Sequence, residues 1–169
     1  RTGVPANACF THALTEPAVD DIDSDGNLEV VVASTEDAIV AYSGKNGTAE
    51  WRVPLSTYGY GRPTVANVTP APGPEVVGSD IRGGVAVVNG NGTVAWRVGL
   101  NDTQWSAARV WQAPIVADVN ADKTPEVVIG SGSGPAVIAA DGRLLWQRNG
   151  SAKYVAAAQA DDDPALELF

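Results

Sequence analysis

The sequence predicts an all-β chain that forms a segment of a β-propeller, built from four-stranded antiparallel blades. Three glutamates recur at spacings of 46 and 51 residues, which fits propeller blades and is too long for leucine-rich or ankyrin units. A tryptophan follows each glutamate, and no stretch shows helical periodicity. The repeated residues are Glu29, Glu75 and Glu126, followed by Trp51, Trp96 and Trp146.

The repeat divides the chain into three complete blades and part of a fourth. Because a propeller closes as a ring of about four to eight blades, we expect the remainder of the same propeller, or another chain, to complete a larger ring. The expected units are residues 1–16 as a leading segment or the end of a preceding blade, 17–55, 63–100 and 113–149 as blades, and 154–169 as the partial blade.

The partial blade has room for a first strand, a loop and the start of a second strand. Glu167 stands 41 residues after Glu126 and marks the equivalent place in this unit. The apolar residues around it have no blade of their own to bury them, and apolar residues beside an unpaired edge favour association. We therefore expect further sequence or another chain to complete this blade, with Phe169 at a packed contact. The uncovered residues are Leu166, Leu168 and Phe169.

The first two strands of each unit are predicted from proline and from apolar runs. Short apolar segments that begin with proline fit a first strand at the crowded centre of a ring. Second strands are apolar at consecutive positions, which indicates burial of both faces by adjacent blades. The predicted first strands are Pro17–Ile22, Pro63–Val68 and Pro114–Val119, and the predicted second strands are Leu28–Ala33, Glu75–Gly78 and Glu126–Gly130.

The third and fourth strands are predicted to form hairpins. The turns contain Asn-Gly or Asp-Gly pairs, which supply the positive φ angles of tight turns. The fourth strand carries the repeated tryptophan between polar neighbours, as in residues 50–52, and this pattern fits an exposed outer strand. The predicted third strands are Ala38–Tyr42, Val85–Val88 and Ala136–Ala139.

Charge and hydropathy exclude two classes of partner. The chain carries 11 basic and 20 acidic residues, a formal charge of −9, whereas binding to a phosphate backbone requires clustered Lys and Arg. We therefore expect no nucleic acid. No apolar run approaches the roughly 18 to 20 residues that cross a bilayer, so we expect no membrane span in this segment. Because only three of the basic residues are lysine, the acidic composition is compatible with a halophilic source. An equally good interpretation is that the acidic residues are mostly cation ligands and turn residues.

No residue pattern in the chain indicates catalysis. Cys9 and His12 are the only cysteine and histidine, so neither a disulfide within the chain nor a complete zinc site can form. Nucleophile elbows, paired zinc histidines and phosphate-binding glycine loops are all missing from the sequence. We expect a protein that is not an enzyme.

The loop between the first two strands of the first unit has the composition of a cation site. Residues 21–29 place carboxylates at loop positions 1, 3, 5 and 9 and glycine at position 6. Hard divalent cations take six to eight oxygens at about 2.3 to 2.6 Å, and alternate residues of a tight loop supply them. The loop departs from an EF-hand, because Val32 stands where the position-12 glutamate is required and no helix flanks it.

The pattern D-x-D-x-D-G-x-x-E between two strands resembles the calcium loops of FG-GAP repeats, as in integrin α-subunit propellers. The tryptophan after a D/N-G turn also resembles pyrroloquinoline-quinone-type propeller repeats. The resemblance covers residues 17–169 and implies Ca²⁺ in the loops. In the first unit the implied ligands are Asp21, Asp23, Asp25, the carbonyl of Asn27, and Glu29.

The other loops match this pattern to different degrees. The third keeps every ligand type, but Lys123 replaces the position-6 glycine, so we expect a weaker site formed by Asp118, Asn120, Asp122, the carbonyl of Thr124, and Glu126. The second loop, residues 67–75, contains three prolines and almost no side-chain ligands, and we expect no cation there. The fourth replaces the first acid with Gln159 and the glycine with Pro164, leaving a weaker set: Asp161, Asp163 and Glu167.

Five of the nine asparagines lie in N-x-S/T acceptor sequences, more than chance predicts. Good turn formation by N-G-T accounts for two of them, but not for Asn101. Extracellular calcium modules bind weakly and fill only where free calcium is high, so calcium and glycosylation both indicate an extracellular, cell-surface or virion-surface location. The acceptor asparagines are Asn46, Asn67, Asn91, Asn101 and Asn149.

The expected function is that of a non-catalytic, calcium-stabilised β-propeller module of an extracellular or surface glycoprotein, mediating protein–protein interaction or adhesion. Two alternatives stay open. One is a carbohydrate-recognising module of a secreted enzyme, which would use the aromatic residues Tyr58, Tyr60, Trp105 and Trp111. The other, implied by the resemblance, is a fragment of a quinone-dependent dehydrogenase propeller, although a single cysteine cannot form the vicinal disulfide usual in those enzymes.

Overall fold

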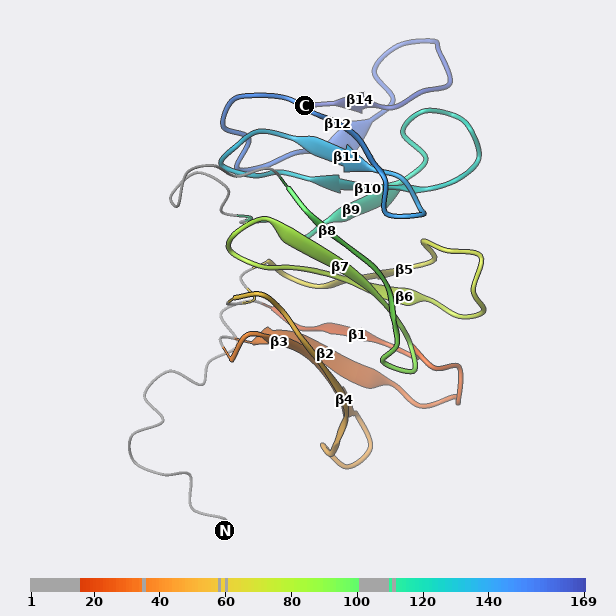
Figure 1. Ribbon diagram of the computed structural model, residues 1–169. Coiled ribbons are helices and arrows are strands. Elements are labelled where there is room, and N and C mark those ends of the chain that lie inside the picture. The colour runs from red at the N-terminus through yellow and green to blue at the C-terminus, as the bar shows by residue number, and fades with distance from the viewer. Residues whose placement is uncertain (1–15, 35, 58, 60, 101–109, 111) are drawn as a thin grey trace.

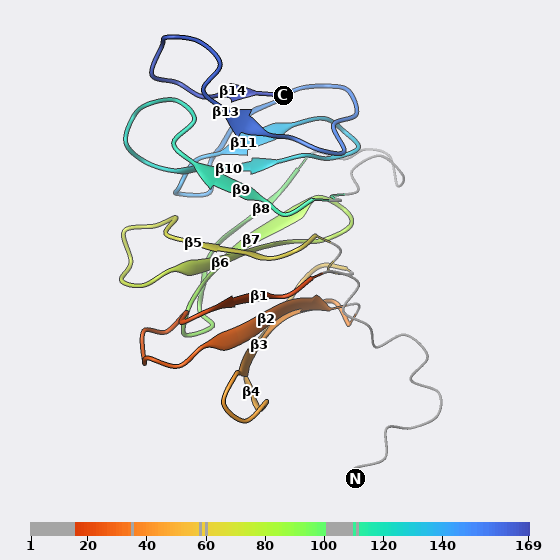
Figure 2. The same ribbon diagram turned by 180° about the vertical axis from the view of Figure 1, so that it is seen from behind.

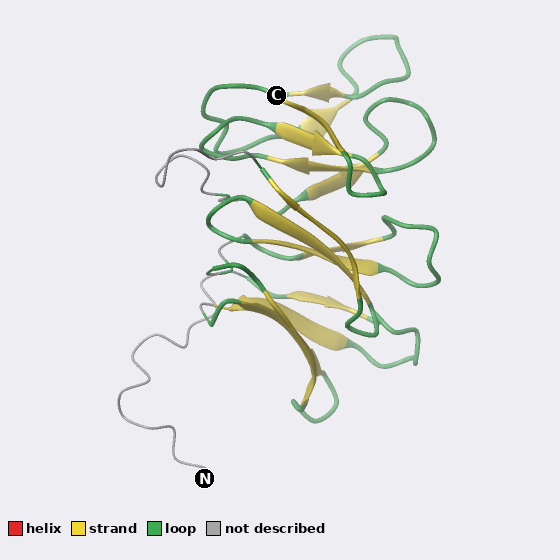
Figure 3. Cartoon of the chain, in the orientation of Figure 1, coloured by secondary structure: helices red, strands yellow, loops and turns green. Residues whose placement is uncertain are grey.

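The chain is all-β. The computed structural model describes residues 16–34, 36–57, 59, 61–100, 110 and 112–169. Within these ranges, strands form three four-stranded antiparallel sheets and one two-stranded sheet, and there is no helix (Figure 1, Figure 3). The same ranges therefore contain no helix with the length and apolarity that a membrane span requires.

Each four-stranded sheet is a blade whose strands pair in chain order. Blade 1 consists of β1 (Ala18–Asp20), β2 (Glu29–Ser34), β3 (Ala38–Ser43) and β4 (Ala49–Pro54). Blade 2 consists of β5 (Thr64–Ala66), β6 (Glu75–Ser79), β7 (Gly84–Asn89) and β8 (Val94–Gly99). Blade 3 consists of β9 (Ile115–Ala117), β10 (Glu126–Ile129), β11 (Ala136–Ile138) and β12 (Leu144–Gln147), and the partial blade of β13 (Ala157–Ala158) and β14 (Glu167–Leu168).

The blades stack face to face, with the first strands of blades 1, 2 and 3 side by side (Figure 1). The loops that join first and second strands all project from one side of the stack, on the right in Figure 1 and on the left in Figure 2. Three apolar clusters lie between successive blades. Both faces of the second strands β6 and β10 are buried, as predicted from their consecutive apolar residues, whereas β2 is buried on one face only, since Val30 and Val32 are half-buried. The fourth strands of blades 1 and 2 are mostly exposed.

The first strands are shorter than predicted. β1 ends at Asp20 rather than at Ile22, because the N–H of Ile22 donates to the Glu29 carboxylate (3.0 Å) instead of to a neighbouring strand. β5 and β9 end early for the same reason, since the N–H groups of Val68 and Val119 also donate to glutamate side chains. A side-chain acceptor that replaces the ladder therefore ends each first strand.

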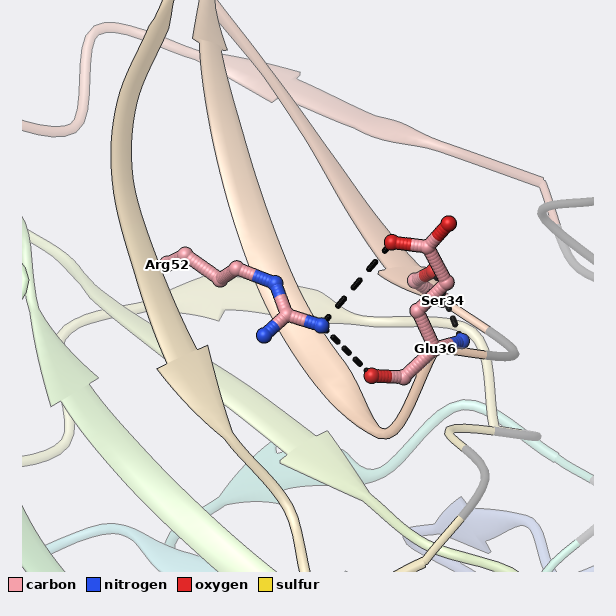
Figure 4. A network of polar contacts seen from close by, with 3 residues as sticks. All are labelled: Ser34, Glu36 and Arg52. Carbon is pink, nitrogen blue, oxygen red and sulfur yellow. Dashed lines mark hydrogen bonds and ion pairs between the residues drawn. The ribbon is translucent and has the colours of Figure 1, made fainter. Parts of the chain in front are cut away.

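The turns between second and third strands are closed by different polar side chains in each blade. In blade 1, Ser34 Oγ accepts the N–H of Glu36 (3.0 Å), and Arg52 from β4 donates to the Glu36 carbonyl (2.6 Å) and lies 3.9 Å from its carboxylate (Figure 4). In blade 2, buried Asp80 accepts the N–H groups of Arg82 and Gly84 at 2.9 and 2.8 Å. Burial raises the pKa of Asp80, and the backbone donors oppose this rise. These acids and hydroxyls are turn caps.

The repeated tryptophans of blades 1 and 2 each form a hydrogen bond to the following blade. Trp51 Nε1 donates to the carbonyl of Gly90 (2.7 Å), and Trp96 Nε1 donates to that of Ala140 (2.8 Å). The glycine of the accepting turn faces the indole: a Cβ at Gly92 would lie 2.7 Å from Trp51, and one at Gly142 would lie 2.8 Å from Trp96. These contacts pair an outer strand of one blade with the hairpin turn of the next.

The partial blade corrects the expectation that its apolar residues lack a packing surface. Leu166 and Leu168 are partly buried against the cluster that contains Val128 and Val137 of blade 3, so that prediction is wrong for these two residues. Phe169, expected at a packed contact, is 66% exposed in this chain. The two strands of the partial blade therefore pack against blade 3.

We predict that Gly92→Ala destabilises the chain more than Gly47→Ala does. Both glycines have positive φ angles in hairpin turns, +84° and +72°, but nothing lies within 4 Å of a Cβ at Gly47. Left-handed backbone costs alanine about 1–2 kcal/mol, and overpacking adds about 1–3 kcal/mol at Gly92 only. Urea unfolding of both variants measures the difference. Equal losses of stability would contradict the packing role of the Gly92 turn.

Candidate metal centre

The four loops between first and second strands share one framework. A glutamate at loop position 9 turns back, and its Oε2 accepts the backbone N–H of position 2. Three of these glutamates, in blades 1 to 3, are only 1% exposed. The bonds are Ile22 to Glu29 (3.0 Å), Val68 to Glu75 (2.7 Å), Val119 to Glu126 (3.0 Å) and Ala160 to Glu167 (2.6 Å).

In blade 1 the backbone of the loop orients its own carboxylates. The two oxygens of Asp21 accept the N–H groups of Asp25 and Gly26, each at 3.0 Å. Asp23 Oδ1 accepts the N–H of Asp25 as well (3.1 Å), and Asp25 Oδ1 accepts the N–H and side-chain amide of Asn27 (2.7 and 2.9 Å). These bonds use some of the acceptor sites on each carboxylate and leave others open.

The same loop brings three of its predicted ligands together. Asp21, Asp23 and Glu29 each offer a carboxylate oxygen, and these oxygens all lie within 4.8 Å of one another. Asp25 lies outside this group, where its Oδ1 is bonded to Asn27. Burial raises the pKa of Glu29, and the charges of Glu50, Asp23 and Asp25 raise it further against the opposing bond from Ile22. The loop therefore concentrates negative charge around a buried carboxylate.

The side chain at loop position 3 decides how the second glutamate oxygen is satisfied. In blade 2, Thr69 Oγ1 donates to Glu75 Oε1 (2.6 Å). In blade 3, Asn120 Nδ2 donates to Glu126 Oε1 (3.2 Å), while the Asn120 oxygen accepts the N–H of Asp122 (2.9 Å). An ionised carboxylate has no proton to donate. Blade 1 and the partial blade have aspartate at position 3, so their glutamates face another acceptor there.

The third loop reproduces the backbone of the first with weaker ligands. Asp118 accepts the N–H groups of Asp122 and Lys123 (3.1 and 2.9 Å), and Lys123 takes the positive φ angle (+73°) that Gly26 takes in blade 1. Burial raises the pKa of Glu126, whereas the hydroxyl of Thr124 lowers that of Asp122. Among the described residues this loop forms no group of three carboxylates, because position 3 is an amide.

The fourth loop is better arranged than its sequence indicates. Asp161, Asp163 and Glu167 place one oxygen each within 4.8 Å of the others, as in blade 1. Backbone N–H groups orient these carboxylates too: Asp163 N–H donates to Asp161 (2.9 Å), and Ala165 N–H donates to Asp163 (2.8 Å). The sequence predicts a weaker site in this loop, and the fold brings its three predicted carboxylates together as it does in blade 1.

The remaining predicted sites divide between exposed positions and positions outside the described residues. Asn46 and Asn91 cap their hairpin turns, accepting the N–H groups of Thr48 (2.9 Å) and Thr93 (3.0 Å). The four exposed acceptor asparagines are Asn46, Asn67, Asn91 and Asn149. The candidates outside the described residues are Asn101, Tyr58, Tyr60, Trp105, Trp111, Cys9 and His12.

Similarity to known proteins is found at the level of structure. No family model and no curated protein matches the chain. BBS1N in complex with ARL6DN has a TM-score of 0.62 at 12% identity, over 85% of this chain and 46% of that chain. Quinohemoprotein alcohol dehydrogenase from Comamonas testosteroni has a TM-score of 0.57 at 15% identity, over 79% of this chain and 20% of that chain. BamB from Moraxella catarrhalis has a TM-score of 0.51 at 17% identity, over 72% of this chain and 33% of that chain.

These structures establish the fold. The chain spans between a fifth and a half of their lengths, and identities this low carry no information on activity. All three are propeller-type folds, and the dehydrogenase is consistent with blades of the pyrroloquinoline-quinone type. The chain is therefore a segment of a β-propeller, built from three four-stranded blades and the inner half of a fourth.

Proposed function

We propose that the chain is a calcium-stabilised, non-catalytic β-propeller module of an extracellular or surface glycoprotein, and that it binds protein partners. One observation carries the calcium proposal. Glu29 is buried beside Asp21 and Asp23, and its second oxygen has no side-chain donor among the described residues, whereas Thr69 and Asn120 supply one in blades 2 and 3. A buried, ionised carboxylate without a compensating partner is costly.

Calcium fits the donors that the first loop presents. The available atoms are carboxylate oxygens, which hard cations prefer, and Ca²⁺ accepts six to eight of them in flexible geometry. The cation would supply the positive charge that loop position 3 cannot, and it would lower the pKa of Glu29. The ligands would be the aspartates and the glutamate of residues 21–29 with the carbonyl of Asn27. The group at Asp161, Asp163 and Glu167 supports a second cation by the same reasoning.

The surface location rests on the acceptor asparagines. The four described ones are exposed in loops or turns, as glycosylated asparagines are. In this proposal the role of calcium is structural, because the cation would connect the first strand of a blade to the second through their shared loop.

The loops that project from one side of the stack would then offer a rigid surface for a protein partner.

We predict that Ca²⁺ raises the melting temperature and that chelation lowers it. Binding to the native state alone adds about 2.7 kcal/mol of stability at 100 times Kd. Asp23→Asn should abolish one bound Ca²⁺ and should also stabilise the calcium-free chain, because an amide can donate to Glu29 as Asn120 donates to Glu126. Calorimetric titration counts the bound Ca²⁺, and the melting temperature in chelator measures the stability of the calcium-free chain. Glu16→Gln, an exposed position outside the loops, removes the same charge and should keep full binding.

An unchanged melting temperature on chelation at low salt would overturn the calcium proposal. Loss of binding in the Glu16→Gln control would show that overall charge, rather than a built site, attracts the cation.

We predict the converse change in blade 3. Asn120→Asp removes the donor to Glu126 and creates the position-3 carboxylate of blade 1. The calcium-free variant should lose about 1–3 kcal/mol, because a buried acceptor loses its partner. Added Ca²⁺ should restore stability, so the gain on calcium addition exceeds that of the wild type. A variant destabilised equally with and without Ca²⁺ would show that this loop cannot hold the ion.

We predict that protein from its native source carries N-linked glycans at exposed acceptor sites. Enzymatic release of N-linked glycans converts each occupied asparagine to aspartate, and mass spectrometry of the peptides reports each site. The sites tested are Asn46, Asn67, Asn91 and Asn149. An intact mass that does not change on treatment would remove glycosylation from the proposal and leave the calcium sites unaffected.

A further inference from the structure

An asparagine followed by a glycine carries a chemistry that the proposed function does not use. The backbone nitrogen of the glycine attacks the side-chain carbon Cγ of the asparagine, since glycine has no Cβ to block the approach. The new N–Cγ bond closes a succinimide ring, the Cγ–Nδ2 bond breaks, and the amide leaves as ammonia with the proton of the glycine nitrogen. Water then opens the ring on either side and gives an aspartyl or an isoaspartyl residue. The four pairs of this kind begin at Asn46, Asn89, Asn91 and Asn149.

In the hairpin turn of blade 1, hydrogen bonds restrain both reacting groups. Asn46 Oδ1 accepts the N–H and the hydroxyl of Thr48 at 2.9 and 2.7 Å. The N–H of Gly47, the attacking group, donates to the carbonyl of Ser43 (2.8 Å). The side-chain carbon of Asn46 therefore reaches the Gly47 nitrogen only after these three hydrogen bonds open.

The hairpin turn of blade 2 restrains its two pairs in a similar way. Asn91 Oδ1 accepts the N–H and the hydroxyl of Thr93 (3.0 and 2.7 Å), and the N–H of Gly92 donates to the carbonyl of Asn89 (2.8 Å). Asn89 is itself held, because its Nδ2 donates to Thr93 Oγ1 (2.8 Å) and its backbone lies opposite Glu75 in the sheet. Neither asparagine is free to rotate toward the following nitrogen.

Asn149 and Gly150 have no such restraint. Both residues are exposed, and within the described part of the chain neither the Asn149 amide nor the Gly150 N–H has a hydrogen-bond partner. Gly150 lies outside the strands with a φ angle of +132°, and nothing lies within 4 Å of the position of a Cβ there. The side chain and the nitrogen that must meet are therefore both accessible.

The charge along this segment favours the attack. The glycine nitrogen must lose its proton, and positive charge nearby favours the deprotonated, anionic form. Arg148 and Lys153 flank the pair in the sequence, and both are exposed. No acidic residue stands between Asp141 and Asp161, although the whole chain carries a formal charge of −9.

We propose that Asn149 is a site of spontaneous deamidation by Gly150, and that the isoaspartyl product loosens the connection between β12 and β13. An isoaspartyl residue inserts one additional carbon into the main chain and adds a carboxylate. The connection is short, and Ala152 and Val155 within it pack against the apolar cluster of blade 3. A longer main chain at residue 149 therefore disturbs the packing of the partial blade.

The connection has little room for the additional carbon, because it is fixed on both sides of residue 149. Before this residue, the N–H of Arg148 donates to the carbonyl of Pro135 (3.0 Å), and after it, the N–H of Ala152 donates to the carbonyl of Ser131 (2.9 Å). The turn between these two acceptors lies directly against the connection, since a Cβ at Gly134 would lie 1.8 Å from the carbonyl oxygen of Arg148.

The test incubates the purified, unglycosylated chain at neutral pH and follows each pair by mass spectrometry of its peptides. An isoaspartyl methyltransferase labels the isoaspartyl product. In the folded chain we expect Asn149 to react at least about ten-fold faster than Asn46 or Asn91, a factor equivalent to about 1.4 kcal/mol for opening their hydrogen bonds. In concentrated urea these bonds are absent, and the pairs should react at similar rates.

Two variants test the cause and the consequence. Thr48→Ala removes one donor to Asn46 and should accelerate deamidation there about five-fold, equivalent to about 1 kcal/mol, with the rate at Asn149 unchanged. Asn149→Gln keeps an amide but requires a larger ring for the same attack. After incubation, the wild type should melt at a lower temperature and show faster hydrogen exchange at the Ala152 amide, whereas Asn149→Gln should change in neither respect.

Equal rates at Asn149 and Asn46 in the folded chain, or a ranking that persists in urea, would overturn the assignment of the site. An equal fall in melting temperature for incubated Asn149→Gln would overturn the proposed effect on the connection. The inference does not depend on calcium or on glycans, because the chain tested is unglycosylated and is incubated in chelator. The isoaspartyl form also distinguishes this reaction from enzymatic glycan release, which gives aspartate.

Discussion

The fold depends on a buried glutamate that turns back into the loop of its own blade. Its first oxygen accepts the N–H of loop position 2, and this bond both ends the first strand and fixes the start of the loop. Its second oxygen must also be satisfied, because a buried acceptor without a partner costs about 1–3 kcal/mol, and more if it is charged. The loops differ in how they meet this requirement, with a hydroxyl, an amide or an aspartate at position 3. The residue at position 3 thus varies, while the bond from position 2 to the glutamate is kept in all four loops.

A second constraint links one blade to the next. The tryptophans of the outer strands β4 and β8 lie at the periphery of their own blades, yet the indole N–H of each donates to a turn 39 or 44 residues later. The glycine of that turn is required twice, for its positive φ angle and for the absence of a Cβ beside the indole. Hydrophobic burial between blades is not directional, so these polar and steric contacts set the register in which neighbouring blades stack.

The repeat made much of this structure predictable from sequence. The spacing of Glu29, Glu75 and Glu126 located every second strand, and Asn-Gly or Asp-Gly pairs located the hairpin turns. The limits of prediction were also physical. The early end of β1 follows from a side-chain acceptor seven residues away, and hydropathy does not report it. Burial of Leu168 depends on a neighbouring blade rather than on its own unit.

The candidate metal loops show the same division. Ligand types could be identified from residues 21–29, but their relative merit could not, because a count of oxygens treats Asn120 and Asp161 as similar ligands. In the folded loops they act differently: the Asn120 amide donates to Glu126, whereas Asp161 can only accept. A cation competes with an internal donor in one loop and has no such competitor in the other. Loop position 3 is therefore more informative than the number of acids.

The partial blade joins the two constraints on a single short strand. Glu167, whose carboxylate lies in the fourth loop, and Leu168, whose backbone faces the open edge, are adjacent residues of β14. A strand of two residues has few hydrogen bonds of its own and gains its order from what lies on either side. The order of this strand therefore rests on two contacts outside it: Glu167 accepts the N–H of Ala160 in the loop, and Leu168 packs against the apolar cluster of blade 3.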